Sequence, residues 1–297
     1  TRNQNYRLPA SNFFSMNYEC LICQVKALQK RMDKYEIAEE KRNKIVSQAI
    51  SSIAGINLEK SFSPEITSNI LRELAKESDV KDPYSAEKKE SNQALLSRYS
   101  EFKTKVETSI DKFDTALRYA IAGNIIDFGP THRFDVDETI ERVFQTSFAV
   151  DDSEALEAAI KKAKTILYLG DNCGEIIMDK LFLETIDHPN VIFAVRDQPI
   201  LNDATLKEAR EVGLHEVASL ITNGDNTPST LLHRVSKEFL EIYRSADLII
   251  SKGMGNFEGL MEENDPRLFF LLMIKCPVIG QKVGAVKGDF VVKRSKN

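Results

Sequence analysis

The spacing of apolar positions divides the chain into two parts. In the first part, apolar residues recur every three or four positions, as in Ile66, Ile70 and Leu74, within sequence rich in Lys, Glu, Ala and Leu. This spacing is typical of amphipathic helices. In the second part, short apolar runs alternate with helix-like segments, which is the pattern of a parallel sheet flanked by helices. The pattern therefore predicts a helical region at residues 17–152 and an α/β region at residues 153–297.

The same pattern predicts the individual elements. Strands are expected at residues 166–169, 191–195, 217–221, 248–251, 268–274 and 290–293. Helices are expected around these strands at residues 154–164, 175–185, 203–212 and 229–244. In the helical region, the charged segment 85–113 predicts one long, partly exposed helix, and the mostly apolar segment 117–129 predicts a buried one. Residues 1–16 lack such patterning and are expected to be a leader outside the fold.

The composition narrows the class of protein. Of the 297 residues, 42% are hydrophobic and 29% charged, which is typical of a globular chain with a full core. No run of about 18 apolar residues occurs, so a membrane partner is not expected. The net charge of -5 gives no reason to expect nucleic acid as a partner, because nucleic-acid binding usually needs a basic surface. Four cysteines are too few for a disulfide scaffold and favour a reducing compartment such as the cytoplasm.

Polar residues follow four of the predicted strands at the point where each strand ends. They are Asp171, Asn172 and Glu175; then Arg196, Asn202 and Asp203; then Thr222, Asn223 and Gly224; then Lys252, Gly253, Asn256 and Glu258. The carboxyl ends of parallel strands share one edge of a sheet, and ligands of open α/β sheets bind at that edge. Any one polar loop is ordinary, but four in succession predict a binding site there.

The residue types in these loops indicate a divalent cation and a phosphate. Asp171, Asn172 and Asp203 carry the oxygen ligands that Mg²⁺ and Mn²⁺ prefer. Lys252 is a compact cation suited to a phosphate, and the glycines beside it allow backbone N–H groups to approach an anion. Thr222 and Asn223 begin a similar anion-binding turn. Taken alone, Asp171 and Asn172 are equally compatible with a role as caps of the following helix.

The buried helix predicted at residues 117–129 contains two polar residues. Asn124 and Asp127 are three positions apart and therefore share a helix face. A buried aspartate needs a hydrogen-bond partner or a cation. Either these two side chains bind neighbouring backbone, or they reach into the predicted site from the helical region.

Several segments, in this order, resemble the signature segments of the metal-dependent damage-control phosphatase family. They are residues 171–175 (DNCGE), 201–205 (LNDAT) and 251–258 (SKGMGNFE), with 18–23 (YECLIC), 123–127 (GNIID) and 269–276 (FFLLMIKC) around them. The resemblance thus runs from about residue 17 to the end of the chain. The paired cysteines near its start are similar to the stand-alone prokaryotic and archaeal branch of that family. Cys173 departs from the family, which more often has a small residue such as Ala there.

The resemblance implies a three-layer α/β/α Rossmann-like fold with an N-terminal helical region. It also implies a phosphatase that uses Mn²⁺, Ni²⁺, Co²⁺ or Mg²⁺ to hydrolyse a phosphate monoester on a small metabolite. Such a metabolite would be a damaged or side-product compound, for example a sugar phosphate, a nucleotide or a phosphopantetheine-like molecule. By the resemblance, Asp171, Asn172 and Asp203 would hold the metal and Lys252 would contact the phosphate.

The sequence leaves two aspects of the predicted chemistry open. The carboxylate that orients the attacking water, or attacks directly, is expected among Asp171, Asp203, Glu175 and Asp127. Predicted substrate or phosphate contacts are Lys252, Gly253, Asn256, Glu258, Thr222, Asn223, Asn124 and Arg196. The same loops would also serve a phosphometabolite- or nucleotide-binding protein without turnover. A Rossmann-like methyltransferase is less favoured, because no glycine-rich loop follows the first strand of the α/β region.

The cysteines permit more than one interpretation. Cys20 and Cys23 form a C-x-x-C pair, and Cys276 lies far away in the sequence. A redox pair, or a soft-metal site with Cys276 as a third ligand, is compatible with this arrangement. The favoured alternative is that these cysteines are buried thiols that pack the first helix against the sheet, and they are not counted among the predicted metal ligands.

Overall fold

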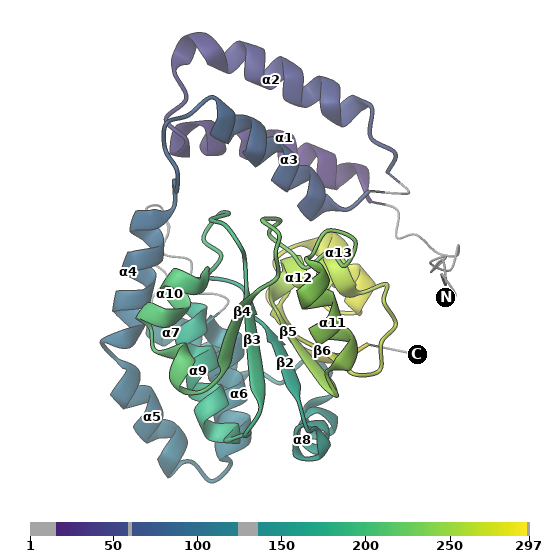
Figure 1. Ribbon diagram of the computed structural model, residues 1–297. Helices are drawn as coiled ribbons and strands as arrows, with labels where there is room; N and C mark the ends of the chain where they lie inside the picture. The colour runs from purple at the N-terminus through teal and green to yellow at the C-terminus, as the bar shows by residue number, and fades with distance from the viewer. Residues whose placement is uncertain (1–15, 59–60, 124–135, 296–297) are drawn as a thin grey trace.

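The computed structural model describes residues 16–58, 61–123 and 136–295 and is built around one seven-stranded sheet (Figure 1). The strand order is β1-β7-β6-β5-β2-β3-β4. The strands are β1 (Val150–Asp151), β2 (Ile166–Leu169), β3 (Val191–Val195), β4 (Ser219–Thr222), β5 (Leu248–Lys252), β6 (Leu268–Met273) and β7 (Phe290–Arg294). Each strand predicted from its apolar run is present. Neighbouring strands are parallel except β6 and β7, which are antiparallel, and the short edge strand β1 was not predicted.

The strands bury side chains on both faces, which is why they appear as continuous apolar runs. Along β6, Phe269 and Leu271 point into one core, whereas Leu268, Phe270 and Leu272 point into the other. On the first face the described helices are α4 (Ser85–Leu96), α5 (Tyr99–Thr108), α6 (Lys112–Gly123), α7 (Val136–Gln145), α8 (Ser153–Lys162), α9 (Glu175–Ile186) and α10 (Leu206–Glu211). A 3₁₀ turn, η1 (Leu214–Glu216), follows α10. The second face carries α11 (Lys237–Ser245), α12 (Gly253–Leu260) and α13 (Pro277–Val283).

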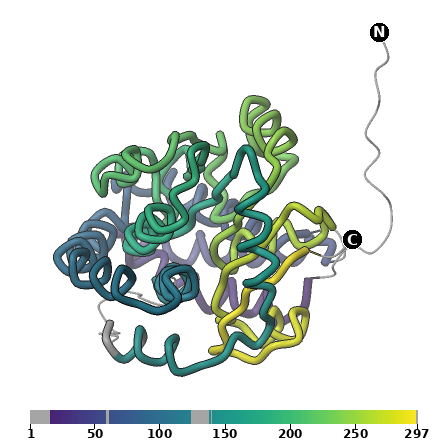
Figure 2. The backbone as a smooth tube through the Cα atoms, turned by 90° about the horizontal axis from the view of Figure 1, so that it is seen from below, coloured from purple at the N-terminus to yellow at the C-terminus, as the bar shows by residue number. Residues whose placement is uncertain are grey.

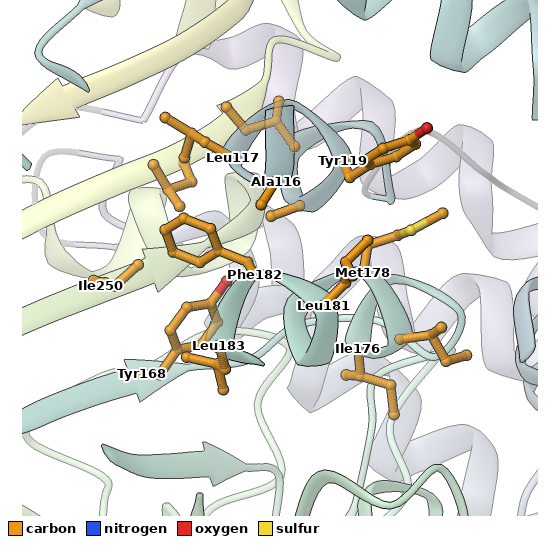
Figure 3. Packing of buried hydrophobic residues seen from close by; sticks show 14 of the residues in the cluster. Ala116, Leu117, Tyr119, Tyr168, Ile176, Met178, Leu181, Phe182, Leu183 and Ile250 are labelled. Carbon is orange, nitrogen blue, oxygen red and sulfur yellow. The ribbon is translucent and has the colours of Figure 1, made fainter. Parts of the chain in front are cut away.

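This arrangement confirms the predicted three-layer α/β/α fold. Helices α4 and α5 lie at the end of the molecule opposite α13 in both views (Figures 1 and 2). Helix α6 is apolar on nearly every side because it packs against α9 and also against α5 and α7. Figure 3 shows Leu117 and Tyr119 of α6 near Met178, Leu181 and Phe182 of α9, and all five side chains are buried. This packing holds α9, whose first turn carries Glu175, firmly against the sheet.

Three N-terminal helices form a separate layer above one edge of the sheet (Figure 1), and we call this layer the cap. They are α1 (Tyr18–Lys34), α2 (Glu39–Ala54) and α3 (Ser63–Lys76). The cap has its own small core, which includes Leu28, Ile45 and Leu71, and Ile200 from the loop after β3 packs into it. Met16 is also buried there and donates its N–H to the carbonyl of Leu58 (2.7 Å), so this residue, predicted to be in the leader, belongs to the cap.

The helical region thus consists of the cap and of helices that share a core with the sheet. The structure differs from the prediction for this region in two features. The segment 85–113 is not one helix, because α4 ends at Leu96 and α5 starts at Tyr99. At this break the Ser97 hydroxyl donates to the carbonyl of Ala94, which is the kind of local bond that competes with helix. The strand β1 also lies within residues 17–152, so the sheet starts before the predicted boundary.

The helix predicted at 229–244 is shorter than expected. Helix α11 begins at Lys237, since Ser236 caps it by accepting a hydrogen bond from the N–H of Phe239 (3.1 Å). Ser229 instead donates to the carbonyl of Gly255 and helps to hold the segment before α11 against α12.

None of the helices in the described ranges is both long enough and apolar enough to cross a membrane.

Candidate active site

The loops after β2 and β3 are joined to each other beyond the ends of the strands. Asn172 and Asp203 form an antiparallel bridge. The N–H of Ala204 donates to the carbonyl of Asp171, and the N–H of Cys173 donates to the carbonyl of Asn202, both at 2.9 Å. These backbone bonds place the side chains of Asp171 and Asn172 beside that of Asp203.

The start of α9 settles the alternative that Asp171 or Asn172 caps this helix. Its N-cap residue is Gly174, which has a φ of 81°, and no side chain makes a capping bond there. The N–H of Gly174 donates to Oδ1 of Asn92 on α4 (2.6 Å). Glycine is favoured at this position because other residues rarely adopt a positive φ. Neither Asp171 nor Asn172 therefore caps α9.

Asp171 and Asp203 are two buried carboxylates in the same small volume. Both are less than a tenth exposed. Burial, together with the charges of Asp203 and Glu175, raises the pKa of Asp171 to about 8, and burial also raises the pKa of Asp203. Arg196 offsets part of this repulsion, since its Nε donates to Asp203 (2.7 Å) and its Nη2 lies 3.6 Å from Asp171. One guanidinium for two buried carboxylates leaves an excess of negative charge.

This excess of charge fits a divalent cation. The donor set is two carboxylates and one amide, all hard oxygen ligands of the kind that Mg²⁺ and Mn²⁺ bind. Asn172 donates through Nδ2 to Asp171 (3.1 Å), and no donor in the described part of the chain reaches its Oδ1. In the described ranges, no three His, Cys, Asp or Glu side chains form a ready metal cluster.

Lys252 lies beneath this site, at the end of β5, and is fully buried. Its ammonium contacts Asp179 (2.5 Å) and Glu175 (2.6 Å) on α9 and donates to the carbonyl of Ala120 (2.8 Å). Burial alone would lower the pKa of Lys252, but the two carboxylates outweigh it and raise that pKa. Lys252 is therefore a charged residue that holds α9 to the sheet.

Glu175 links the buried ion pair of Lys252 and Asp179 to the candidate metal site. Its Oε2 lies 3.4 Å from the backbone N–H of Asn172 and 3.5 Å from Nδ2 of the same residue. On the far side, Tyr168 donates to Asp179 (2.7 Å). A continuous polar chain thus runs from Tyr168 through Asp179, Lys252 and Glu175 to Asn172, in a dry environment that strengthens each contact.

Arg196 and Asn256 form a second support behind Asp203. The Nη2 of Arg196 donates to Oδ1 of Asn256 (3.0 Å), and its Nη1 lies 3.3 Å from the hydroxyl of Thr230. Asn256 in turn donates to the carbonyls of Gly170 and Lys252. Both residues are almost fully buried, so the structure places them as supports of the carboxylates and of the strand ends.

A cavity of about 350 Å³ opens above Asp171, Asn172 and Asp203, between the edge of the sheet and the cap. Glu258, predicted as a substrate contact, lines it, and burial raises the pKa of Glu258 to about 7. The exposed Lys275 also lines the cavity, and its charge lowers the pKa of Asp171 against the effect of burial.

Other predicted contacts lie away from this cavity. Thr222 donates to Asp197 (3.0 Å), Asn223 is buried and accepts from the N–H of Asp225, and neither lines the cavity. Gly253 begins α12 with a φ of 78° and lies beside the lining residues Met254 and Gly255. Asn124 and Asp127 lie outside the described residues.

Three of the four cysteines line the cavity, although Cys276 is far from the other two in the sequence. Cys20, Cys23 and Cys276 all line it and all are free thiols. Burial, with the nearby charges of Glu258 and Cys276, raises the pKa of Cys20. Cys173 is different, because it is buried in the core and burial raises its pKa strongly. A neutral, enclosed thiol is a packing group, which accounts for Cys173 beside the candidate metal ligands.

Sequence reasoning missed several residues of this site. Asp179 lies four positions after Glu175 on α9, and that spacing was a usable signal for a shared helix face. Gln24 and Arg31 on α1 are seven positions apart and also share a face, but nothing in the sequence indicated that α1 faces the sheet edge. Lys275 follows a buried strand like the residues that were predicted, and it was overlooked.

The contact between α12 and the segment before α11 leads to a prediction for stability. A Cβ on Gly255 would lie 2.3 Å from the carbonyl oxygen of Pro228, a backbone atom that cannot move easily. We expect Gly255→Ala to lower the free energy of unfolding by about 1–3 kcal/mol, as overpacking usually does. Urea unfolding measures this change.

Gly55→Ala is the control. Its Cβ would lie 3.8 Å from the nearest atom, and the φ of Gly55 is -86°, so we expect an unchanged or higher stability for this variant. Equal stability of both variants would contradict the tight contact.

Comparisons with known proteins agree with this architecture. A family model described as the damage-control phosphatase ARMT1-like domain matches residues 16–291. A protein of Pyrococcus horikoshii named damage-control phosphatase is 33% identical over 285 residues, which cover 95% of this chain and 98% of that protein. A damage-control phosphatase of Archaeoglobus fulgidus is 29% identical, over 86% of this chain and 90% of the relative. The crystal structure of a DUF89 family protein from Pyrococcus horikoshii superposes with a TM-score of 0.87 at 33% identity, covering 95% of this chain and 99% of that one.

Proposed function

The chain belongs to the damage-control phosphatase ARMT1-like domain family, and on that premise we propose that it is a divalent-metal-dependent phosphatase. Its substrate would be a small phosphorylated metabolite, such as a damaged or side-product sugar phosphate, nucleotide or phosphopantetheine-like compound. The observation that carries the proposal is the pair of buried carboxylates, Asp171 and Asp203, with Asn172 beside them at the base of a cavity. Such a pair is costly in the absence of a compensating cation.

Each residue of the site has a proposed role. Asp171, Asn172 and Asp203 would hold Mn²⁺, Ni²⁺, Co²⁺ or Mg²⁺, which when bound supplies Lewis-acid activation and a template for the phosphoryl group. Arg196 orients Asp203 through its 2.7 Å bond, and its charge lowers the pKa of that carboxyl against the larger effect of burial. Asp171 or Asp203 would orient or deprotonate the attacking water, or attack directly.

Two lysines differ in how well they are placed for the phosphate. Lys252 would have to leave Glu175 and Asp179 to make the contact that the family resemblance implies. From its present position it fixes Glu175, and through Glu175 the backbone of Asn172. Lys275 is exposed and lines the cavity, and it is the cation that we propose to face the phosphate oxygens.

A metal-dependence assay tests the proposed function. After removal of bound metal with a chelator, we expect the protein to release no phosphate from 4-nitrophenyl phosphate or from a panel of phosphorylated metabolites. Addition of Mn²⁺, Ni²⁺, Co²⁺ or Mg²⁺ should restore release by a factor on the order of 10² or more, because Lewis-acid activation contributes several kcal/mol. The measurement is colorimetric detection of phosphate.

The same assay separates the proposal from its alternative. A protein that only binds phosphometabolites would show ligand-induced thermal stabilisation but no phosphate release with any of the four metals. Release that is equally fast with and without metal would contradict the assignment of Asp171, Asn172 and Asp203 as ligands.

A further inference from the structure

Arg31 on α1 is a cation that has no carboxylate partner among the described residues. Within the described part of the chain, its one side-chain hydrogen bond runs from Nη1 to Oε1 of Gln24 (2.8 Å), and it takes part in no ion pair. Arg42, on the neighbouring helix of the cap, behaves in the ordinary way and pairs with Asp33 and Glu39. A half-buried guanidinium without a counter-charge is unfavourable, and burial lowers the pKa of Arg31 accordingly.

The position of Arg31 is fixed by a network within the cap. Gln24 is buried, and its Oε1 accepts hydrogen bonds from both Arg31 and the hydroxyl of Thr67 (3.0 Å). Its Nε2 donates to the hydroxyl of Ser63 (3.2 Å). Gln24 is therefore held by α3 and in turn orients Arg31. A guanidinium has five N–H donors, so most of the donors of Arg31 remain for another acceptor.

The network faces the same cavity as the candidate metal site. Arg31, Gln24 and Thr67 line it from the cap, and Asp171 and Asp203 line it from the edge of the sheet. A substrate whose reacting phosphate lies at the aspartates would therefore extend toward α1.

The lining of the cavity is partly apolar. Met254 and Ile279, from α12 and α13, contribute apolar surface to it. Two carboxylates, Glu19 and Glu258, also line the cavity, and neither pairs with Arg31. Glu258 lies near Lys282 and Cys20, and neither Glu258 nor Glu19 is among the charged groups that shift the pKa of Arg31.

We propose that the cap end of this cavity is a subsite for a second anionic group of the substrate, bound by the guanidinium of Arg31. The subsite rests on the proposed phosphatase function and narrows its substrate class to phosphate monoesters that carry a carboxylate or a second phosphate at the far end. A planar guanidinium binds such an oxyanion through two parallel hydrogen bonds. Gln24 is the positioning residue that presents it.

Matched pairs of compounds test this subsite. The substrates are phosphate monoesters with linkers of about three to six carbons that end either in a carboxylate or in a neutral hydroxymethyl group. We expect the wild-type protein, loaded with Mn²⁺, to prefer the carboxylate at the best linker length by roughly 10- to 100-fold in kcat/KM, mainly through KM. Arg31→Met should abolish this preference, and Arg31→Lys should retain part of it.

A second measurement keeps the subsite testable without turnover. Calorimetric titration with the corresponding phosphonates, which are not hydrolysed, should show the same preference for the carboxylate in the wild type and its loss in Arg31→Met. Arg42→Met is the matched control, because this arginine lies in the cap outside the cavity, and its preference should equal that of the wild type.

The outcomes separate the subsite from the phosphatase function. Binding preference without phosphate release would support the subsite and contradict the proposed function. Phosphate release with no preference in either measurement at any linker length, or a preference that survives in Arg31→Met, would overturn the subsite and leave the function standing. Absence of both binding and release would contradict both.

Discussion

Asp203→Asn is expected to reduce metal-dependent phosphate release by a factor on the order of 10³, because the variant loses a charged metal ligand and with it several kcal/mol of transition-state stabilisation. Asn keeps an oxygen that can accept the hydrogen bond from Nε of Arg196, so the fold should be largely retained. Asp203→Ala is less suitable. It would leave the buried Arg196 without its nearest carboxylate, and breaking such a pair costs about 3–5 kcal/mol.

A matched control for this variant lies in the same loop. Asp197 is exposed, accepts a hydrogen bond from Thr222 and does not line the cavity. Asp197→Asn should therefore hydrolyse 4-nitrophenyl phosphate at the wild-type rate over a range of Mn²⁺ concentrations. Full activity of Asp203→Asn at saturating metal, with thermal unfolding unchanged, would remove Asp203 from the proposed metal site.

Lys252→Met should produce the largest loss of stability, about 3–5 kcal/mol in the free energy of unfolding. The substitution removes the ammonium that lies between Glu175 and Asp179 and leaves two carboxylates buried without it. Lys103→Met is the control, since its pair with Glu184 is exposed and such pairs contribute at most about 1 kcal/mol. Urea unfolding of both variants measures the difference.

The loss in Lys252→Met should also depend on pH. Burial already raises the pKa of Asp179, and removal of the ammonium, which lowers it, would raise it further above its value in the unfolded state. The folded protein then binds more protons, so its stability falls as pH rises through the raised pKa of Asp179. We expect a smaller deficit relative to wild type at about pH 5 than at about pH 8. A deficit below about 1 kcal/mol at both values, or one that does not change with pH, would contradict a buried, charged Lys252.

The sheet was predictable because its signal is local. Each apolar run between turn residues corresponds to a strand, and β3 (Val191–Val195) begins and ends where its run does. The direction of β7 was not predictable in this way, since an apolar run has the same pattern in a parallel and an antiparallel strand. The break between α4 and α5 was missed because no glycine or proline marks it, and Ser97 and Arg98 lie within a helical pattern.

The candidate site was predictable only in part, and the difference lies in where each partner comes from. Asp171 and Asp203 follow neighbouring strands, and the rule that strand ends meet places them together. Lys252 was predicted as a phosphate contact from its type and its loop, and that contact remains a prediction. Its two carboxylate partners lie on a helix more than 70 residues earlier in the chain, and no local pattern links them. Arg31 depends on how the cap is placed over the sheet, which is a property of the whole fold.

Diffraction from crystals grown with Mn²⁺, recorded at the manganese absorption edge, tests the central claim most directly. The proposed function predicts one strong anomalous peak in contact with carboxylate oxygens of Asp171 and Asp203 and with Oδ1 of Asn172, at the base of the cavity beneath the cap. A peak at another position, such as the thiols of Cys20 and Cys276, with none between the two aspartates, would contradict it.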